Sequence, residues 1–281
     1  MRRFRLLVVA LFSLVFALAA FGCSASGESA APAASGTAGA ASSDAKTLVV
    51  GCDDFSPFTY NDEAGNMTGI DVDIITEACR RIGYQAQCQF INWEAKDSLL
   101  ASGSIDCIAS CFSMSGRESK YRWAGPYMES RQVVAVSPGS SIQALADLEG
   151  KTIAVRSTTK SESVILDEVN AAVPDVATVF SFADRAYLVP SLLKGYVDAI
   201  ASHEVSIVQY EKDYGVDLRI LDEPLLETGV GFAFDVNDDR GIAEELAAAL
   251  DQMLADGTME RILGEYLDDP ASYLDVEGLD E

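Results

Sequence analysis

The sequence predicts an α/β protein with two lobes and a ligand cleft between them. Two successive series of short apolar strands and helices, within residues 46–109 and 153–213, carry this prediction. A further strand and two helices follow, so the chain returns toward its first series. Alternation of this kind is typical of layered α/β folds. We therefore expect each lobe to be a mainly parallel sheet flanked by helices.

The first 45 residues are typical of an exported and tethered protein. Three arginines precede an apolar run over residues 6–21, which has the length of a signal sequence and is short for a membrane span of about 20 residues. Ala20-Phe-Gly-Cys23 resembles a lipoprotein processing site. We expect residues 1–22 to be a lipoprotein signal peptide and Cys23 to carry acyl chains that anchor the protein to the membrane. An uncleaved transmembrane anchor is the alternative.

Composition also limits the class of partner. Residues 24–45 are mostly Ala, Ser and Gly, which bury too little apolar surface to fold, so we expect residues 23–45 to be the lipidated cysteine and a flexible tether. The rest of the chain is long enough for one large or two medium domains. The formal net charge of −24 repels nucleic acid. We therefore expect no nucleic-acid partner.

The first series contains three expected strands and two expected helices. Apolar side chains recur at helical spacing at Val72, Ile75, Cys79 and Ile82 before Gly83 breaks the pattern. The expected strands cover residues 48–51, 90–91 and 105–109, and the second helix covers residues 95–100. This order of elements is that of a parallel α/β layer.

The second series and the return segment complete the two lobes. We expect strands at residues 153–155, 179–182 and 199–201, helices at 161–170, 184–194 and 205–213, and a return strand at 229–234 with helices at 240–255 and 258–267. Lobe 1 then holds residues 46–131 and 229–281, and lobe 2 holds residues 132–228. The two crossings between the lobes form a hinge. Ligands of open α/β sheets lie beyond the carboxyl ends of the strands, which here means the cleft.

Residues 105–127 have the composition of a recognition loop. An apolar strand opens into the hydroxyl-bearing residues Ser110, Ser113 and Ser115, and Arg117 follows. Hydroxyls and backbone N–H groups at a strand end, together with the planar donor fork of an arginine, match a carboxylate. Taken alone, Arg117 would more often be a surface arginine in an ordinary loop.

Several motifs in order resemble the substrate-binding proteins of polar amino-acid ABC importers, the bacterial solute-binding protein family 3. They are the segment from Asp106 through Arg117 to Pro126-Tyr127, Gly51-Cys-Asp-Asp-Phe-Ser-Pro-Phe58, Gly69-Ile-Asp-Val-Asp-Ile74, Asp147-Leu-Glu-Gly-Lys-Thr-Ile-Ala-Val155, Gly229 to Phe234 and Ala255-Asp-Gly-Thr258. The resemblance covers roughly residues 46–267. It implies a type II periplasmic-binding-protein fold and an extracytoplasmic lipoprotein that captures an amino acid and presents it to ABC permease subunits. We expect a monomer without a cofactor or metal.

The resemblance also implies which residues contact the ligand. Arg117 is expected to bind the α-carboxylate together with Ser113, and Phe55 and Trp93 to stack on the ligand side chain unless they pack within lobe 1. Across the cleft, the helix that begins after Ser157 offers free N–H groups to an anion. The remaining implied ligand residues are Asp53, Ser110, Cys111, Thr159 and Lys160.

Four positions depart from the family pattern or leave it open. The family prefers glycine where this chain has Thr158, and Lys160 either adds charge to the carboxylate site or points into water. Where the family usually carries the aspartate that binds the ligand ammonium, this chain has His203, followed by Glu204. A neutral imidazole supplies no opposite charge, so Glu204 either binds the amine or only caps the following helix. The ligand is then an amino acid, an atypical one or a related carboxylate.

The chain contains six cysteines, of which five remain if one is lipidated. Cys79 and Cys88 stand where some relatives have a disulfide, and the resemblance implies that this pair is bonded. Cys52 and Cys107 fall on strands expected to be neighbours, so they either form a bridge or fill the core. No CxxC or HxxxH spacing occurs and His203 is the single histidine, so we expect no zinc site.

The competing interpretation is an enzyme. Some proteins of this fold are dehydratases of cyclic amino-acid precursors, and Glu204 beside His203 has the chemistry for proton transfer. A serine hydrolase would need a Gly-x-Ser-x-Gly turn, which the chain lacks. A cysteine hydrolase would need His203 to meet Cys111 across the hinge. We therefore expect a binding protein rather than an enzyme.

Overall fold

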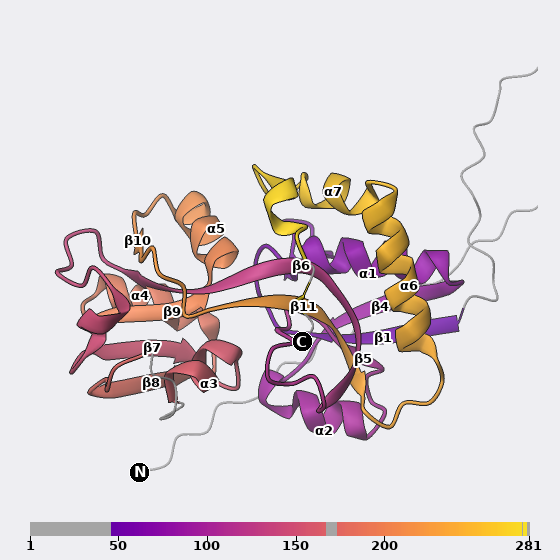
Figure 1. Cartoon of the computed structure of the whole chain (residues 1–281), viewed down its shortest axis with the longest axis horizontal. Coiled ribbons are helices and arrows are strands. Elements are labelled where there is room, and N and C mark those ends of the chain that lie inside the picture. The colour runs from indigo at the N-terminus through magenta and orange to yellow at the C-terminus, as the bar shows by residue number, and fades with distance from the viewer. Residues whose placement is uncertain (1–45, 167–172, 277, 280–281) are drawn as a thin grey trace, which may run out of the picture. The chain divides into compact units, whose positions relative to one another are not determined.

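The computed structural model describes residues 46–166, 173–276 and 278–279 (Figure 1). The expected signal peptide at residues 1–22, the lipidated Cys23 and the tether up to residue 45 lie outside the described residues. Within the described part, no helix is both long enough and apolar enough to cross a membrane.

Nine strands of the described residues form one hydrogen-bonded sheet, in the order β4-β1-β5-β11-β6-β9-β7-β8, with β10 paired to β6. These strands are β1 (Lys46–Cys52), β4 (Tyr84–Phe90), β5 (Cys107–Ile108), β6 (Tyr121–Val136), β7 (Thr152–Arg156), β8 (Thr178–Phe182), β9 (Ala199–His203), β10 (Arg219–Ile220) and β11 (Leu226–Asp235). A separate antiparallel pair joins β2 (Tyr60–Asn61) to β3 (Met67–Thr68).

Helices pack around two ends of this sheet (Figure 1). Lobe 1 is built from β1, β4 and β5 with α1 (Ile70–Arg81), α2 (Lys96–Ala101), α6 (Ile242–Ala255), α7 (Thr258–Leu263) and the 3₁₀ turns η1 (Trp93–Ala95) and η4 (Pro270–Tyr273). Lobe 2 is built from β7 to β10 with α3 (Lys160–Leu166), α4 (Leu188–Leu193), α5 (Glu204–Tyr214) and the 3₁₀ turns η2 (Leu145–Leu148) and η3 (Arg185–Tyr187). The strand and helix order expected from the two apolar series is confirmed.

The sheet as a whole is mixed, whereas each lobe contributes a parallel group of three strands, as expected. Strands β4, β1 and β5 run parallel to one another, as do β8, β7 and β9. Strands β6 and β11 run antiparallel to their neighbours. The difference arises because the two strands that cross between the lobes pair with each other and with the edge of both parallel groups.

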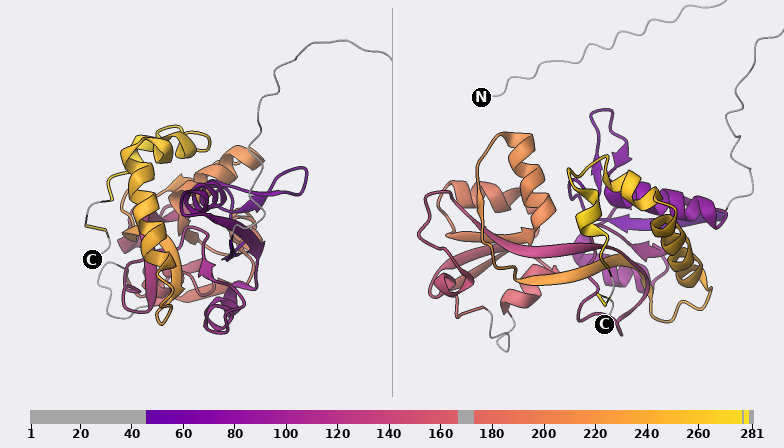
Figure 2. Two further views of the ribbon diagram at one scale, coloured as in Figure 1. Left: turned by 90° about the vertical axis from the view of Figure 1, so that its right-hand side faces the viewer. Right: turned by 45° about the horizontal axis from the view of Figure 1, so that its top comes forward.

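Strands β6 and β11 lie side by side and extend through both lobes (Figures 1 and 2). Their register runs from Leu226 opposite Gln132 to Asp235 opposite Tyr121 and shifts between Val230 and Phe232. Close backbone approach explains the glycines at the shift, because a Cβ on Gly125 would lie 2.9 Å from the Gly231 Cα. The two chain crossings expected from the sequence are therefore one antiparallel ribbon.

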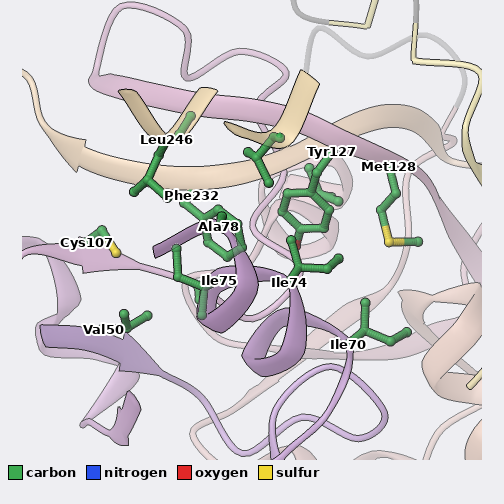
Figure 3. Packing of buried hydrophobic residues seen from close by; sticks show 14 of the residues in the cluster. Val50, Ile70, Ile74, Ile75, Ala78, Cys107, Tyr127, Met128, Phe232 and Leu246 are labelled. Atoms are coloured by element: carbon green, nitrogen blue, oxygen red, sulfur yellow. The ribbon is translucent and has the colours of Figure 1, made fainter. Parts of the chain in front are cut away.

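The main core of lobe 1 follows from alternation along the strands. Leu48, Val50 and Cys52 of β1 face α1, α6 and α7, whereas Val49 packs on the opposite side of the sheet with α2. Helix α1 buries Ile70, Ile74, Ile75, Ala78 and Cys79, one stripe of the helix (Figure 3). Tyr127 and Phe232 of the crossing strands stack on each other beside this stripe, with ring centroids 4.8 Å apart.

Lobe 2 has a core on each face of its sheet. Ile153 and Val155 of β7 pack with α3 and η2, whereas Ala154 faces α4 and α5. Strand β6 contributes to both cores, with Val134 on one face and Val133 on the other. Both lobes are thus helix-sheet-helix layers, which is the arrangement that buries both faces of a parallel sheet.

All five cysteines of the described residues are free thiols. The disulfide implied between Cys79 and Cys88 is therefore not formed in this structure. Cys88 lies on β4 opposite Val50 of the neighbouring strand β1, while Cys79 projects from α1 into the core. Burial raises the pKa of the Cys79 thiol to about 12, and Cys107 fills the same core.

This packing predicts that the four buried thiols react only when the protein unfolds. In a Cys23→Ser variant purified without reductant, a thiol-specific chromogenic reagent should find the five cysteines after denaturation and at most the half-buried Cys88 before it. The other four are buried thiols whose raised pKa values leave little thiolate. Finding two thiols fewer after denaturation would show that a disulfide forms after all.

Candidate ligand-binding site

Side chains from both lobes meet where the parallel strands end. In lobe 1, Asp53 follows β1 and Ser110 follows β5 by two residues. In lobe 2, Arg156 ends β7 and His203 ends β9. The carboxyl ends of parallel strands lie at one edge of a sheet. The two edges touch, since the Arg185 Nη2 atom of lobe 2 lies 3.2 Å from the Asp53 Oδ2 atom of lobe 1.

A small cavity lies between the lobes and is lined by most of the predicted ligand residues. Its lining consists of Phe55, Trp93, Ser110, Cys111, Phe112, Ser113, Arg117, Thr159, Lys160, Arg185 and His203. About 20 Å³ is open to the centre of a water molecule, which is room for about one water. A ligand site usually measures roughly 300 Å³ or more, so the lobes must separate to admit a ligand.

Arg117 contributes a buried guanidinium to this cavity. Its Nη1 atom donates to the Ser113 carbonyl at 3.2 Å, and its Cζ atom lies 4.7 Å from the centre of the Phe112 ring. None of the salt bridges found among the described residues includes Arg117. Burial lowers the pKa of the guanidinium. A desolvated cation without an acidic partner is suited to bind an anion.

Asp71 holds the recognition loop in place, a role that the sequence analysis missed. Its Oδ2 atom accepts from the backbone N–H groups of Ser110 and Cys111, both at 2.7 Å, and its Oδ1 atom accepts from the Tyr127 hydroxyl at 2.7 Å. Ser110 and Cys111 have φ values of 87° and 50°, which few residues other than glycine adopt. Burial raises the pKa of Asp71 to about 6. The helix-entry motif contains this aspartate, but the motif alone does not show what it binds.

The loop after β7 brings lobe 2 to the cavity. Thr158, at the position where the family prefers glycine, adopts a φ of 57°, so this chain keeps the backbone shape that glycine adopts without strain. The Thr159 hydroxyl donates to the Arg156 carbonyl at 2.7 Å. Lys160 reaches toward lobe 1, since a Cβ on Gly116 would lie 3.1 Å from its Nζ atom. Lys160 thus adds its charge to the cavity lining.

Arg185 also lines the cavity and was not expected from the sequence. Its Nη2 atom donates to Asp53, its Nη1 atom lies 3.4 Å from the Ser202 hydroxyl, and its Cζ atom lies 3.5 Å above the centre of the Phe55 ring. Arg156 approaches the other carboxylate oxygen of Asp53 at 3.6 Å. Asp53 therefore contacts two arginines behind the cavity rather than lining it. The sequence offered one indication of this role, because both arginines stand at or just after the carboxyl end of a strand.

His203 lies at the centre of a buried hydrogen-bond network. Its Nδ1 atom lies 2.6 Å from the Ser130 hydroxyl and its Nε2 atom 2.7 Å from the Gln132 side-chain nitrogen. This arrangement fits a neutral imidazole that donates through Nδ1 and accepts at Nε2. Burial first, and then the charges of Arg185 and Arg117, lower the pKa of His203 to about 3. The imidazole is therefore uncharged at neutral pH.

Gln132 connects the network to both lobes. Its side-chain nitrogen donates to the Ser113 hydroxyl of lobe 1 at 3.2 Å, and its side-chain oxygen accepts from the Ser161 hydroxyl of α3 in lobe 2. Gln132 and Ser130 lie on the crossing strand β6, which the sequence analysis did not identify as a strand. Both are almost fully buried, so their polar atoms need these partners.

Cys111 and His203 touch across the cleft, with the thiol sulfur 3.3 Å from Nδ1. The contact that a cysteine hydrolase requires is therefore present. Its chemistry does not fit, because burial raises the pKa of the Cys111 thiol well above its usual range while the imidazole stays neutral. A nucleophilic cysteine needs a lowered pKa. The pair is a packed contact within the network.

Glu204 lies outside the cavity. It is the first residue of α5, and both of its carboxylate oxygens accept from the Arg131 Nη1 atom at 3.0 Å. Of the two alternatives left open for this residue, the structure places it in the first turn of the helix, where a negative charge is favourable.

Phe55 and Trp93 both pack within lobe 1 and line the cavity. The Phe55 ring lies 5.6 Å from the His203 ring, and the Trp93 ring meets the Phe112 ring edge-on at 5.6 Å. Each residue therefore packs in a core of lobe 1 and also borders the cavity, so packing and ligand contact are compatible for both aromatics.

Two larger cavities adjoin the small one. One measures about 280 Å³ and shares Phe55 and Arg185 with it, and the other measures about 270 Å³ and shares Arg117 and Thr159. The two larger cavities have no lining residue in common. In the described part of the chain, no group of His, Cys, Asp or Glu side chains has the arrangement of a metal site.

A hinged two-lobe α/β fold with a polar cavity between the lobes defines the class of extracellular solute-binding proteins. The chain belongs to the bacterial extracellular solute-binding proteins of family 3, whose family model matches residues 48–269.

One relative and two solved structures show the extent of the likeness. The L-cystine-binding protein TcyA of Bacillus subtilis (strain 168) is 28% identical over 271 residues, which cover 94% of this chain and 98% of that protein. The crystal structure of Tv2483 bound to L-arginine is 30% identical, with a TM-score of 0.73 over 80% of this chain and 91% of that chain. The arginine-, lysine-, histidine-binding protein ArtJ of Geobacillus stearothermophilus, 24% identical, shares the fold with a TM-score of 0.73 over 84% of this chain and 100% of that chain.

The neutral His203 predicts an acid-dependent loss of stability. Its pKa is lowered from 6.5 to about 3 in the folded protein, so between these values the unfolded state binds the extra proton. Stability from this residue is therefore present above pH 6.5 and lost as the pH falls toward 3, by up to about 1.4 kcal/mol per pH unit.

Urea unfolding of the wild type and of a His203→Gln variant, compared from pH 7 downward, checks this. The free-energy difference between the two proteins should change below pH 6.5 in favour of the variant. A difference that is independent of pH would contradict a neutral buried imidazole.

Proposed function

We propose that this protein captures an amino acid or a close derivative outside the cytoplasm by closing its two lobes, and delivers it to an ABC importer. The observation that carries the proposal is the cavity to which lobe 1 contributes Arg117 and lobe 2 contributes Thr159 and Lys160. Family membership supports the delivery step. Relatives whose names state a cystine or arginine ligand support an amino acid.

Closure around the ligand is the step that signals capture. A ligand shifts the equilibrium toward the closed form only if it binds that form better, which requires contacts with both lobes. We place the hinge near residues 131 and 229, so that lobe 1 is residues 46–131 with 229–281 and lobe 2 is residues 132–228. The hydrophobic cores support this division. Two cores draw their buried residues from residues 133–225, and the other two draw nearly all of theirs from residues 48–128 and 230–263.

The enzymatic alternative has less support. A dehydratase would use Glu204 beside His203 for proton transfer, but Glu204 pairs with Arg131 outside the cavity. The Cys111 thiol is held protonated by burial. Neither group is therefore placed for catalysis on a ligand in this cavity.

Arg117→Ala should weaken binding of a carboxylate ligand by about 2 to 5 kcal/mol, because it removes a charged hydrogen bond from a desolvated site. A thermal-shift screen against amino acids, their derivatives and small dicarboxylates identifies the ligand, since a ligand at about 100 times its Kd adds about 2.7 kcal/mol of stability. Calorimetric titration of the wild type and the variant then measures the loss.

Arg261→Ala is the matched control, because Arg261 is an exposed arginine of α7 paired only with Glu265. It should bind as the wild type does. Equal affinity of the Arg117→Ala variant and the wild type would refute the assignment of Arg117, and the absence of any ligand in the screen would refute the proposed function.

We also propose that Cys23 is lipidated after removal of residues 1–22 and anchors the protein to the outer face of the cytoplasmic membrane. The support is the arginine-flanked apolar segment and the Ala20-Phe-Gly-Cys23 sequence. A Cys23→Ala variant expressed in bacteria should leave the detergent-soluble membrane fraction or retain an unprocessed leader. Wild-type protein that carries no acyl chain by mass spectrometry would contradict the anchor.

A further inference from the structure

The cavity lining carries positive charge and no negative charge. Arg117, Lys160 and Arg185 are its cationic members, and no aspartate or glutamate lines it. The nearest carboxylate, Asp53, has one oxygen 3.2 Å from Arg185 and the other 3.6 Å from Arg156. This group of two arginines and one aspartate retains one net positive charge. Together with Arg117, which has no ion pair among the described residues, the cavity lining therefore carries a net positive charge. Asp97 and Asp54 act on Arg117 and Arg185 only at longer range.

The two cavity guanidiniums stand at separate points of the lining. Arg117 comes from the recognition loop of lobe 1 and also borders the cavity of about 270 Å³, whereas Arg185 comes from η3 of lobe 2 and borders the cavity of about 280 Å³. Each lies on its own aromatic ring, Phe112 for Arg117 and Phe55 for Arg185. A ligand held between the lobes can therefore present one end to each arginine.

Two buried hydrogen-bond donors of residues in the cavity lining also lack an acceptor in the described part of the chain. The Arg185 Nε–H and the Trp93 indole N–H are buried and have no hydrogen-bond partner among the described residues. Buried donors of this kind are rare unless a ligand or water completes them. Both residues line the cavity, so a ligand bound there is in a position to supply acceptors.

The described cavity lining has no carboxylate that could bind an ammonium group. His203, at the position where the family usually has an aspartate, is neutral and its two ring nitrogens already contact Ser130 and Gln132. Glu204 pairs with Arg131. The carboxylate of Asp53 is in contact with two arginines. An ammonium in this small cavity would therefore lie among cations, because carboxylates without an ion pair, such as Asp54, line only the adjoining cavity of about 280 Å³.

We propose that the ligand is a small dicarboxylate, with one carboxylate bound by Arg117 and the other by Arg185, and that an amino group on it is not required for binding. Acidic amino acids belong to this class as dicarboxylates, together with their analogues that lack nitrogen. The inference rests on the proposed function, since it names the class of solute that the same cleft takes. Arg185 is then the residue that determines specificity.

The experiment is a calorimetric titration of the full-length protein, held in detergent, with a panel of matched compounds. The acids are L-aspartate, L-glutamate, succinate and glutarate, the monoamides are L-asparagine and L-glutamine, and L-arginine and L-leucine represent basic and apolar amino acids. We expect at least one acid to bind about tenfold or more tightly than its monoamide, because losing one charged contact in a desolvated site costs at least that factor. We also expect a nitrogen-free acid to bind within about tenfold of the amino acid of equal length.

Variants at position 185 test the assigned residue. Arg185→Gln removes the charge and keeps a shorter polar side chain that can still donate a hydrogen bond, so it should lower affinity for the dicarboxylate while leaving affinity for the monoamide nearly unchanged. Arg185→Lys should restore part of the discrimination. Urea unfolding of each variant shows whether loss of the Asp53 contact has affected the fold, and the wild-type panel decides the ligand class independently of the variants.

The outcomes separate the inference from the proposed function. Tighter binding of neutral or basic amino acids than of every acid would overturn the dicarboxylate assignment and leave the proposed amino-acid receptor standing. Unchanged discrimination in a folded Arg185→Gln variant would overturn the role of Arg185. Binding by no member of the panel would overturn both the inference and the amino-acid function.

Discussion

The pairing of β6 with β11 is the constraint on which the rest of the structure depends. These two strands supply apolar side chains to cores in both lobes, and their hydrogen bonds fix which residues face the cleft. Ser130 and Gln132 consequently lie beside His203, which ends the neighbouring strand β9. A relative movement of the lobes about this ribbon would separate Ser113 of lobe 1 from Gln132 of lobe 2, so the polar network is sensitive to the closed arrangement.

Closure has an electrostatic cost in this protein, and that cost makes it depend on a ligand. Bringing the lobes together removes Arg117 and Arg185 from water, and burial lowers the pKa of each guanidinium. Buried cations are unfavourable unless an anion compensates them. Asp53 compensates part of the charge of Arg185, whereas Arg117 has no ion pair among the described residues and only the longer-range charge of Asp97 acts on it. A carboxylate ligand thus stabilises the closed form twice, through its contacts and by offsetting this charge.

Apolar periodicity predicted most of the fold because each strand and helix buries a regular stripe. The helix expected around Val72 to Ile82 is α1, and the return strand and closing helices are β11, α6 and α7. Strand β6 was missed because Arg122, Gly125-Pro126 and Glu129 interrupt its apolar pattern, as suits a strand that crosses between two cores. In the cavity, motif matching located Arg117 and the loop residues. It could not find Asp71 or Arg185, because their roles depend on partners far away in the sequence.

The two unusual features of the cleft, His203 and Arg185, make physical sense only together. The positive charge of Arg185 acts directly on His203, since it is one of the causes that lower the pKa of the imidazole. An aspartate at position 203 would lie near this guanidinium, pair with it and remove its charge from the cavity. The neutral imidazole instead satisfies its hydrogen bonds within the network and leaves the positive charge in place. His203 lacks the negative charge of an aspartate and Arg185 supplies a positive one, so both residues favour a more acidic ligand.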